Sequence, residues 1–169
     1  MSAAPSGTGS PEQPASARSA LGLGDVVQVD DESRWLCSGV ELVEGNDLRC
    51  AAWLGGHDGA EGLVVCFPPP ESRFLWLRLQ PLEVPASPPT RLELDGRLLD
   101  RQASHPACVR AVGKLPLELG TAGTVTWYLG AAGDAAFLLQ TDAGSLSGVG
   151  RRIDGAELDR MGCSDPAEG

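Results

Sequence analysis

The stretch Trp53-Leu54-Gly55-Gly56-His57-Asp58-Gly59 recurs in outline as Tyr128-Leu129-Gly130-Ala131-Ala132-Gly133-Asp134. In both copies, residues with alternating apolar character precede the glycines, and an apolar run that ends in a turn follows them. Alternation at period two on either side of a glycine-containing turn is typical of a β-hairpin. The sequence therefore predicts one type of hairpin that is used twice.

Similar strand and turn patterns extend along most of the chain. The predicted strands are residues 26–29, 35–43, 48–54, 63–67, 74–79, 91–94, 97–102, 107–117, 124–129, 135–141 and 146–153. Residues 154–161 are the only stretch with helical spacing, which predicts one short C-terminal helix. Many short strands separated by turns predict an all-β, mainly antiparallel barrel or sandwich, because both architectures protect the edges of a sheet.

The chain divides into two β-rich halves, residues 20–85 and 91–161, joined by a proline-rich spacer at residues 86–90. Residues 1–19 consist mainly of Ser, Ala, Pro and Gly without hydrophobic periodicity, so we expect a disordered tail there and another at residues 162–169.

Alignment of the two halves predicts which strand faces point inward. The residues placed opposite one another are Cys50 and Val125, Ala52 and Trp127, and Leu54 and Leu129. Two interpretations remain open, either a duplicated β-meander or the chance agreement of two ordinary meanders.

In residues 74–79, Leu75, Leu77 and Leu79 share one face, which we expect to be the core, and Trp76 lies on the opposite face over a rim.

The composition argues against several classes of function. The net charge of −10 opposes binding to a phosphate backbone, so no nucleic-acid partner is expected. The excess of acidic residues suits either solubility or a cationic partner. The N-terminal stretch lacks the apolar run of a signal peptide, and no segment has the roughly 20 apolar residues that cross a bilayer. We therefore expect a cytoplasmic protein without membrane insertion.

Five cysteines and two histidines are the candidates for nucleophilic or metal chemistry. The cysteines (Cys37, Cys50, Cys66, Cys108 and Cys163) are odd in number and lack the spacing of a disulfide framework, so we expect buried thiols. His105 and Cys108 are three residues apart on a strand and should point to opposite faces. His57 lies beside Asp58 in a glycine-rich turn and is expected to be solvated. The sequence contains no Cys-x-x-Cys pair, so no zinc site is indicated.

Three other groups of residues have ordinary structural explanations. Residues 55–62 are rich in glycine but return into a strand, so no helix N-terminus is available to bind a phosphate. The acidic run of Asp30, Asp31 and Glu32 could attract a polyamine, and a solvated turn explains it more simply. The aromatic residues could form a cation-binding cage, but their positions in strands favour core packing. They are Trp35, Trp53, Trp76, Trp127 and Tyr128.

Several segments resemble bacterial domain-of-unknown-function family 4178. Residues 21–27 (LGLGDVV) and 35–40 (WLCSGV) resemble the opening of that family, residues 112–116 (VGKLP) and 123–129 resemble its later segment, and residues 150–153 (GRRI) resemble its closing strand. Lys114 departs from the family pattern, which more often has an acidic residue there. The resemblance implies a β-rich cytoplasmic protein without an assigned activity, often encoded near an aminopropyltransferase similar to spermidine synthase and near small membrane proteins.

The function predicted from the sequence is that of a non-catalytic adaptor that binds another protein. The alternatives are a sensor of a small cationic ligand such as a polyamine, or an accessory protein to an aminopropyltransferase, and an enzyme with a Cys-His pair. We assign no catalytic residue, metal ligand or cofactor-binding residue, and expect no cofactor. The sequence does not indicate which residues bind the partner.

Overall fold

The computed structural model describes residues 21–56, 61–68 and 73–160. It contains eleven strands and one short 3₁₀ turn within those residues. In chain order they are β1 (Val26–Val29), β2 (Glu32–Glu44), β3 (Asp47–Gly56), β4 (Gly62–Cys66), β5 (Arg73–Leu79), β6 (Arg91–Leu94), β7 (Arg97–Val112), β8 (Ala122–Gly130), β9 (Asp134–Thr141), β10 (Ser145–Asp154), η1 (Gly155–Glu157) and β11 (Asp159–Arg160). The prediction of an all-β, barrel-like fold is confirmed.

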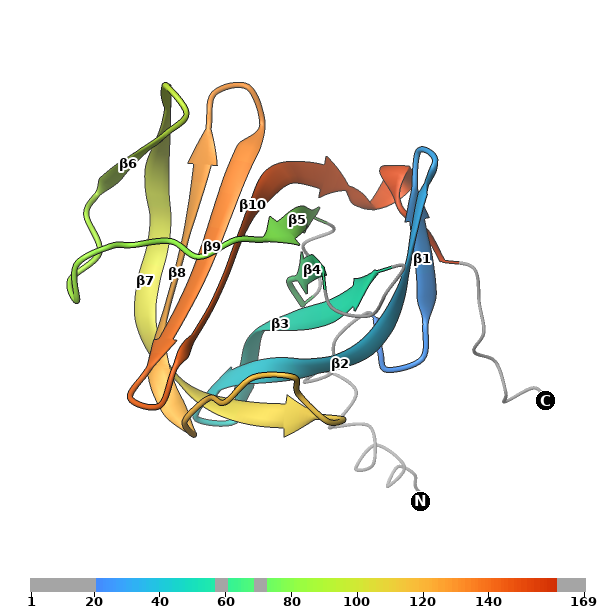
Figure 1. The fold of residues 1–169 in the computed structure, drawn as a ribbon, viewed down its shortest axis with the longest axis horizontal. Coiled ribbons are helices and arrows are strands. Elements are labelled where there is room, and N and C mark those ends of the chain that lie inside the picture. The colour runs from blue at the N-terminus through green and yellow to red at the C-terminus, as the bar shows by residue number, and fades with distance from the viewer. Residues whose placement is uncertain (1–20, 57–60, 69–72, 161–169) are drawn as a thin grey trace, which may run out of the picture.

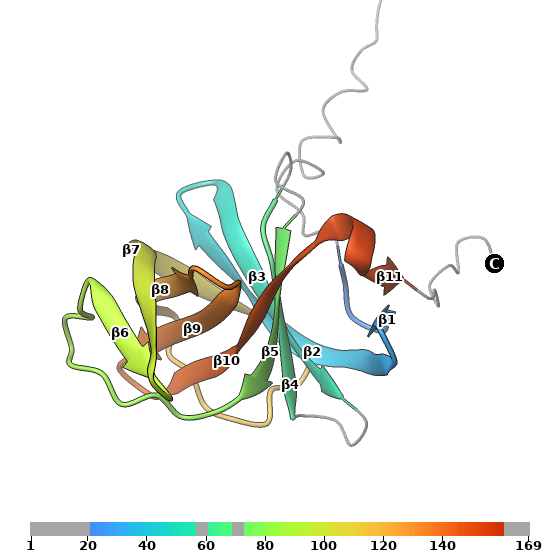
Figure 2. The ribbon, with the colours of Figure 1, turned by 90° about the horizontal axis from the view of Figure 1, so that it is seen from above.

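Eight of these strands close into an antiparallel barrel in the order β2-β3-β4-β5-β10-β9-β8-β7, with β7 pairing back to β2 (Figure 1). Within the barrel, two pairings join the halves of the chain, β2 with β7 and β5 with β10, and outside it β1 also pairs with β11. The remaining strands lie outside the barrel, with β1 and β11 on one side and β6 on the other (Figure 2). Closure leaves only the short strands β6 and β11 as edges of the sheet.

The two halves repeat one arrangement. A short strand joins a long strand through a two-residue turn, with Asp30 and Asp95 at left-handed φ angles of 55° and 51°. Each long strand, β2 or β7, contains a bulge and continues into the barrel. We call the β1–β2 pair the first hairpin and the β6–β7 pair the second hairpin.

Apolar side chains form three clusters rather than one. The barrel interior contains Cys50, Ala52, Leu54 and Val125 as buried residues, with Trp127 and Leu129 packed against them, as the alignment of the halves predicts. Beneath the first hairpin, Leu36, Trp53, Val64 and Trp76 belong to a first outer cluster. Beneath the second hairpin, Leu99, Tyr128, Ala136 and Val149 occupy the matching ladder positions in a second outer cluster. Each hairpin therefore covers an apolar patch on the outside of the barrel.

Three expectations about individual elements require correction. The predicted C-terminal helix is only the three-residue turn η1, and the chain then continues as β11. The predicted strands at residues 97–102 and 107–117 are one strand, β7, which ends at Val112, so residues 113–117 are not strand, and it includes Pro106 where β7 pairs only with β8. Leu75 and Leu77 do face the core, but Trp76 is 6% exposed under the first hairpin rather than at a rim.

The predicted tails at residues 1–19 and 162–169 lie outside the described residues. The spacer at residues 86–90 contains no strand, yet it is fastened to the barrel. The buried Tyr128 hydroxyl donates a hydrogen bond to the Pro89 carbonyl, and the Arg101 guanidinium donates one to the Pro88 carbonyl. The connection between the halves thus packs against the second hairpin region.

Candidate functional site: an arginine-lined groove between the two hairpins

A groove crosses the outer face of β5 and β10, between the first and second hairpins. It consists of two adjoining hollows of about 310 Å³ each, and both are lined by Arg78, Asp134, Val149 and Gly150. One hollow extends to the first hairpin and is lined further by Glu32, Arg34, Trp76, Leu77 and Arg151. The other extends to the second hairpin and is lined further by Leu94, Asp95, Arg97 and Leu99. The groove therefore lies where the halves of the chain meet.

Arg34 on β2 holds the first wall of the groove in place. Arg34 is only 5% exposed, and one of its terminal nitrogens donates hydrogen bonds to the carbonyls of Leu63 at 3.2 Å and Leu77 at 2.7 Å. The Nε atom donates to a Glu32 carboxylate oxygen at 3.0 Å. The guanidinium carbon lies 3.9 Å from the centroid of the Trp76 ring, which is a cation–π distance. One side chain thus joins the first hairpin to β4 and β5.

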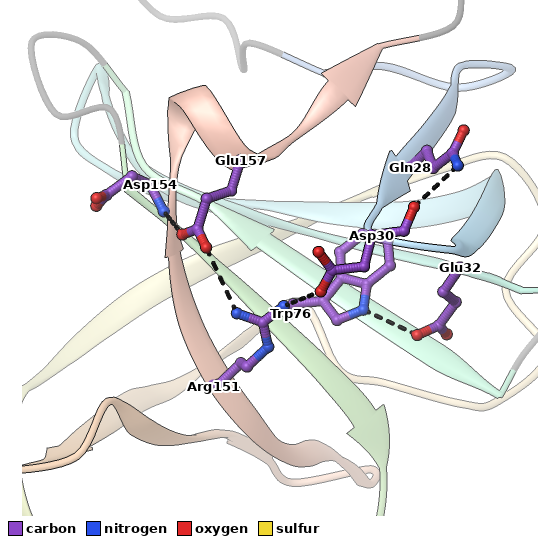
Figure 3. A network of polar contacts seen from close by, with 7 residues as sticks. All are labelled: Gln28, Asp30, Glu32, Trp76, Arg151, Asp154 and Glu157. Carbon is purple, nitrogen blue, oxygen red and sulfur yellow. Dashed lines mark hydrogen bonds and ion pairs between the residues drawn. The ribbon is translucent and has the colours of Figure 1, made fainter.

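Glu32 receives two donors and stays ionised. The Trp76 indole N–H donates to its second carboxylate oxygen at 3.0 Å, as Figure 3 shows. Partial burial raises the pKa of Glu32, but the Trp76 hydrogen bond and the positive charge of Arg34 outweigh it and hold the pKa below its usual value. Burial lowers the pKa of Arg34, because it disfavours the charged guanidinium, and the negative charge of Glu32 partly offsets this shift.

Arg151 on β10 closes one end of the groove with a network of exposed contacts. It forms ion pairs with Asp30 at 3.2 Å and with Glu157 at 3.7 Å, and Glu157 also accepts a hydrogen bond from the Asp154 backbone N–H (Figure 3). These contacts link the turn of the first hairpin to the chain after β10. Because the pairs are exposed, each contributes little to stability.

The second wall carries its own ion pair. Arg97, the first residue of β7, lies 2.6 Å from a carboxylate oxygen of Asp134 at the start of β9. Half-buried Leu94 and buried Leu99 provide apolar surface beside this pair. The wall thus offers both a charged and an aliphatic part.

Arg78 on the floor differs from the other arginines of the groove. It is exposed on β5, opposite Val149 in the ladder, and among the described residues its side chain has no hydrogen bond or ion pair, while its charge helps to lower the pKa of Glu32. Together, the lining residues supply four guanidinium groups against three carboxylates. The lining therefore has one more positive than negative charge in a chain with a net charge of −10, and Arg78 is its cation suited to bind an anionic group.

Of the residues weighed in the sequence, Glu32 and Trp76 come together in the groove, and Asp30 reaches its margin through Arg151. His57 and Cys163 lie outside the described residues. His105 shares one face of β7 with Ala107 and Val109, which pack in the barrel interior, so Cys108 points the other way as expected. Within the described segments, no group of three His, Cys, Asp or Glu residues could hold a metal ion.

The aromatic residues are dispersed rather than gathered into a cage. Trp53 and Trp76 belong to the first outer cluster, Trp127 packs against the barrel interior, and Tyr128 belongs to the second outer cluster. Trp35 is 57% exposed, unlike the core role expected for it. Core packing is thus confirmed for four of these five residues.

The expectation of buried thiols holds for Cys50 and Cys66 and is wrong for Cys108, which is exposed, while Cys37 is half-buried. Burial raises the pKa of the Cys50 thiol well above its usual range.

Only thiolates react quickly with alkylating reagents. We expect iodoacetamide to alkylate Cys108 in the native protein at least tenfold faster than Cys50 or Cys66, as measured by peptide mass mapping. Equal labelling of Cys50 and Cys108 without denaturant would contradict the described burial.

The lowered pKa of Glu32 predicts a pH-dependent contribution to stability. The charged form is favoured in the folded state, so its contribution is complete above the ordinary value of 4.5 and is lost as the pH falls through the lower folded pKa. Because the Glu32 side chain is 56% exposed, we expect the free energy of unfolding of wild type to exceed that of Glu32→Gln by less than about 1 kcal/mol at pH 7. Urea unfolding between pH 7 and pH 3 should show the difference shrinking in acid. A difference that grows in acid would exclude this interpretation.

The sequence did not reveal the groove itself. Arg78 and Arg151 are charged residues at outward positions of strands that also carry buried aromatic or aliphatic neighbours, which is the one local indication of a polar site. Their proximity depends on the pairing of β5 with β10, and these strands are about seventy residues apart in the chain.

The chain matches no model of a protein family, no curated protein and no solved structure. Along the described parts of the chain, no helix has the length and apolar character that crossing a bilayer requires. The argument for function therefore rests on the groove.

Proposed function

We propose that this protein is a non-catalytic cytoplasmic adaptor that binds an extended segment of another protein in the groove between its two hairpins. The observation that carries the proposal is the open groove across β5 and β10, with the exposed and unpaired Arg78 on its floor. The resemblance to domain-of-unknown-function family 4178 agrees with this proposal and remains a prediction.

The shape and composition of the groove favour a segment of polypeptide. Raised hairpins bound it on two sides, and its floor is the outer face of two paired strands. The outward side chains of this floor come from Arg78, Val149 and Arg151, whereas Gly150 alternates with the last two and faces the barrel interior. The lining contains both charged and apolar side chains, which suits a peptide whose successive side chains differ in polarity.

The positive lining favours this function over the sensing of a polyamine. Two of the three acidic residues that would attract a polyamine already contact arginines, since Glu32 pairs with Arg34 and Asp30 pairs with Arg151. The face of Trp76 that a cation could occupy is covered by Arg34. A cationic ligand would have to displace these contacts before it could bind in the groove.

The proposal can be tested by capture with matched variants. Tagged full-length wild type, Arg78→Glu and Arg152→Glu are incubated with lysate of the source cells, and the bound proteins are quantified by mass spectrometry. Arg152 is a suitable control because it is exposed, carries the same charge and lies on the opposite face of β10 from Arg151.

We expect at least one protein to be enriched equally by wild type and Arg152→Glu, and at least tenfold less by Arg78→Glu. Near-ultraviolet circular dichroism of the three proteins should be identical, which establishes that the exposed substitutions leave the fold intact. If every captured protein is retained by Arg78→Glu, the groove is not the binding site.

A further inference from the structure

We propose that the groove selects a segment that carries an aspartate or glutamate next to an aliphatic residue, with Arg78 as the receptor for the carboxylate. This inference rests on the proposed function and adds the chemistry of the partner. It combines the unpaired cation on the floor with the charge and apolar surface of the two walls.

The first argument is that Arg78 remains available while the cations around it are occupied. Arg34 bonds to Glu32, Arg97 to Asp134, and Arg151 to Asp30 and Glu157. Arg78 is exposed beside these residues and has no such partner among the described residues. A guanidinium group binds a carboxylate through two parallel hydrogen bonds, which gives both affinity and a defined geometry.

The second argument is that two of the three carboxylates of the groove are already held by other side chains. The two oxygens of Glu32 accept hydrogen bonds from Arg34 and Trp76. Asp134 is held by Arg97 at 2.6 Å. Asp95 lines the same hollow as Arg78, so the four arginines of the lining exceed its three carboxylates by one charge, and Arg78 is the cation left for an incoming carboxylate.

The third argument is the apolar surface immediately beside Arg78. Val149 is its ladder partner on β10, and Leu94 lines the same hollow from the second hairpin. Both side chains are half-buried, so an aliphatic side chain placed there removes further apolar surface from water. Successive side chains of an extended segment point to opposite sides, so in a segment that lies between Arg78 and Val149 the acidic residue faces Arg78 and its aliphatic neighbour faces Val149.

The test uses three six-residue peptides that alternate leucine with glutamate, glutamine or lysine. Each peptide is titrated into the isotope-labelled full-length protein while the amide signals are followed by nuclear magnetic resonance. For the glutamate peptide, we expect saturable shifts centred on Arg78, Val149 and Gly150. The glutamine peptide should bind at least fivefold more weakly, and the lysine peptide should cause no shifts in the groove.

Variants locate the effect at one side chain. Arg78→Gln should weaken binding of the glutamate peptide at least fivefold, whereas Arg152→Gln, which removes the same charge elsewhere, should leave it unchanged. Equal binding of the three peptides, shifts outside the groove, or no shifts with the glutamate peptide would overturn the acidic selectivity. If the peptides show no acidic selectivity but capture from lysate still depends on Arg78, the adaptor function stands and only the inference about the partner fails. If capture also does not depend on Arg78, the adaptor function at the groove is excluded as well.

Discussion

An Arg34→Met variant should be about 3 kcal/mol less stable than wild type, because Arg34 satisfies several buried groups at once. Without the guanidinium, the carbonyls of Leu63 and Leu77 lose a shared donor, and Glu32 loses its counter-charge. Methionine can still cover the Trp76 ring, so the loss reports on the polar contacts rather than on packing. Urea denaturation monitored by tryptophan fluorescence measures the free energy of unfolding.

Two further variants separate this explanation from a general effect of removing charge. Arg34→Lys keeps the charge but cannot form the same fork of hydrogen bonds, so we expect an intermediate loss. Arg91→Met removes an arginine that forms an ion pair with Asp100, and both side chains of this pair are exposed. We expect it to lower the free energy of unfolding by less than about 1 kcal/mol. If Arg34→Met were no more destabilising than Arg91→Met, Arg34 would not be an anchor of the first hairpin.

A Gly150→Ala variant should lose about 2–3 kcal/mol, because the added methyl group collides with the backbone. A Cβ atom at this position would overlap the Trp76 carbonyl oxygen and lie 2.8 Å from the Cα atom of Leu77. Neither atom can move without separating β5 from β10, which is one of the two barrel pairings that join the halves. Thermal and urea unfolding of the variant provide the measurement.

Gly22→Ala is the matched control for this substitution. A Cβ atom at Gly22 meets nothing within 4 Å, and no left-handed backbone conformation is required there. We expect its stability to stay within about 0.5 kcal/mol of wild type. Similar stability of Gly150→Ala and Gly22→Ala would mean that β5 and β10 are not in the close contact described.

Much of the fold could be predicted from local patterns. The alternation of Leu75 and Leu77 with Phe74 and Trp76 identified which side faces the barrel interior. The Asp95-Gly96 pair indicated a two-residue hairpin turn, which the structure confirms between β6 and β7. Such signals are readable because strand periodicity and turn geometry depend on residues close together in the chain.

The closure of the barrel and the groove could not be predicted in this way. They depend on the pairing of β2 with β7 and of β5 with β10, for which alternation specifies a face but no partner. Trp76 was misplaced at a rim for the same reason, since the first hairpin that covers it begins more than forty residues earlier. Residues 154–161 have helical spacing, but too few of them pack against the core to support a helix, so only η1 forms.

Photocrosslinking in living source cells tests most directly whether the groove is the binding surface. The photoreactive residue benzoylphenylalanine replaces either Leu94, which lines the groove, or Leu23, which is 50% exposed and lies outside the groove lining. We predict a crosslinked partner from the Leu94 position that disappears when Arg78→Glu is added, and none from the Leu23 position. Equal crosslinking from both positions, or crosslinking at Leu94 that survives Arg78→Glu, would contradict the account.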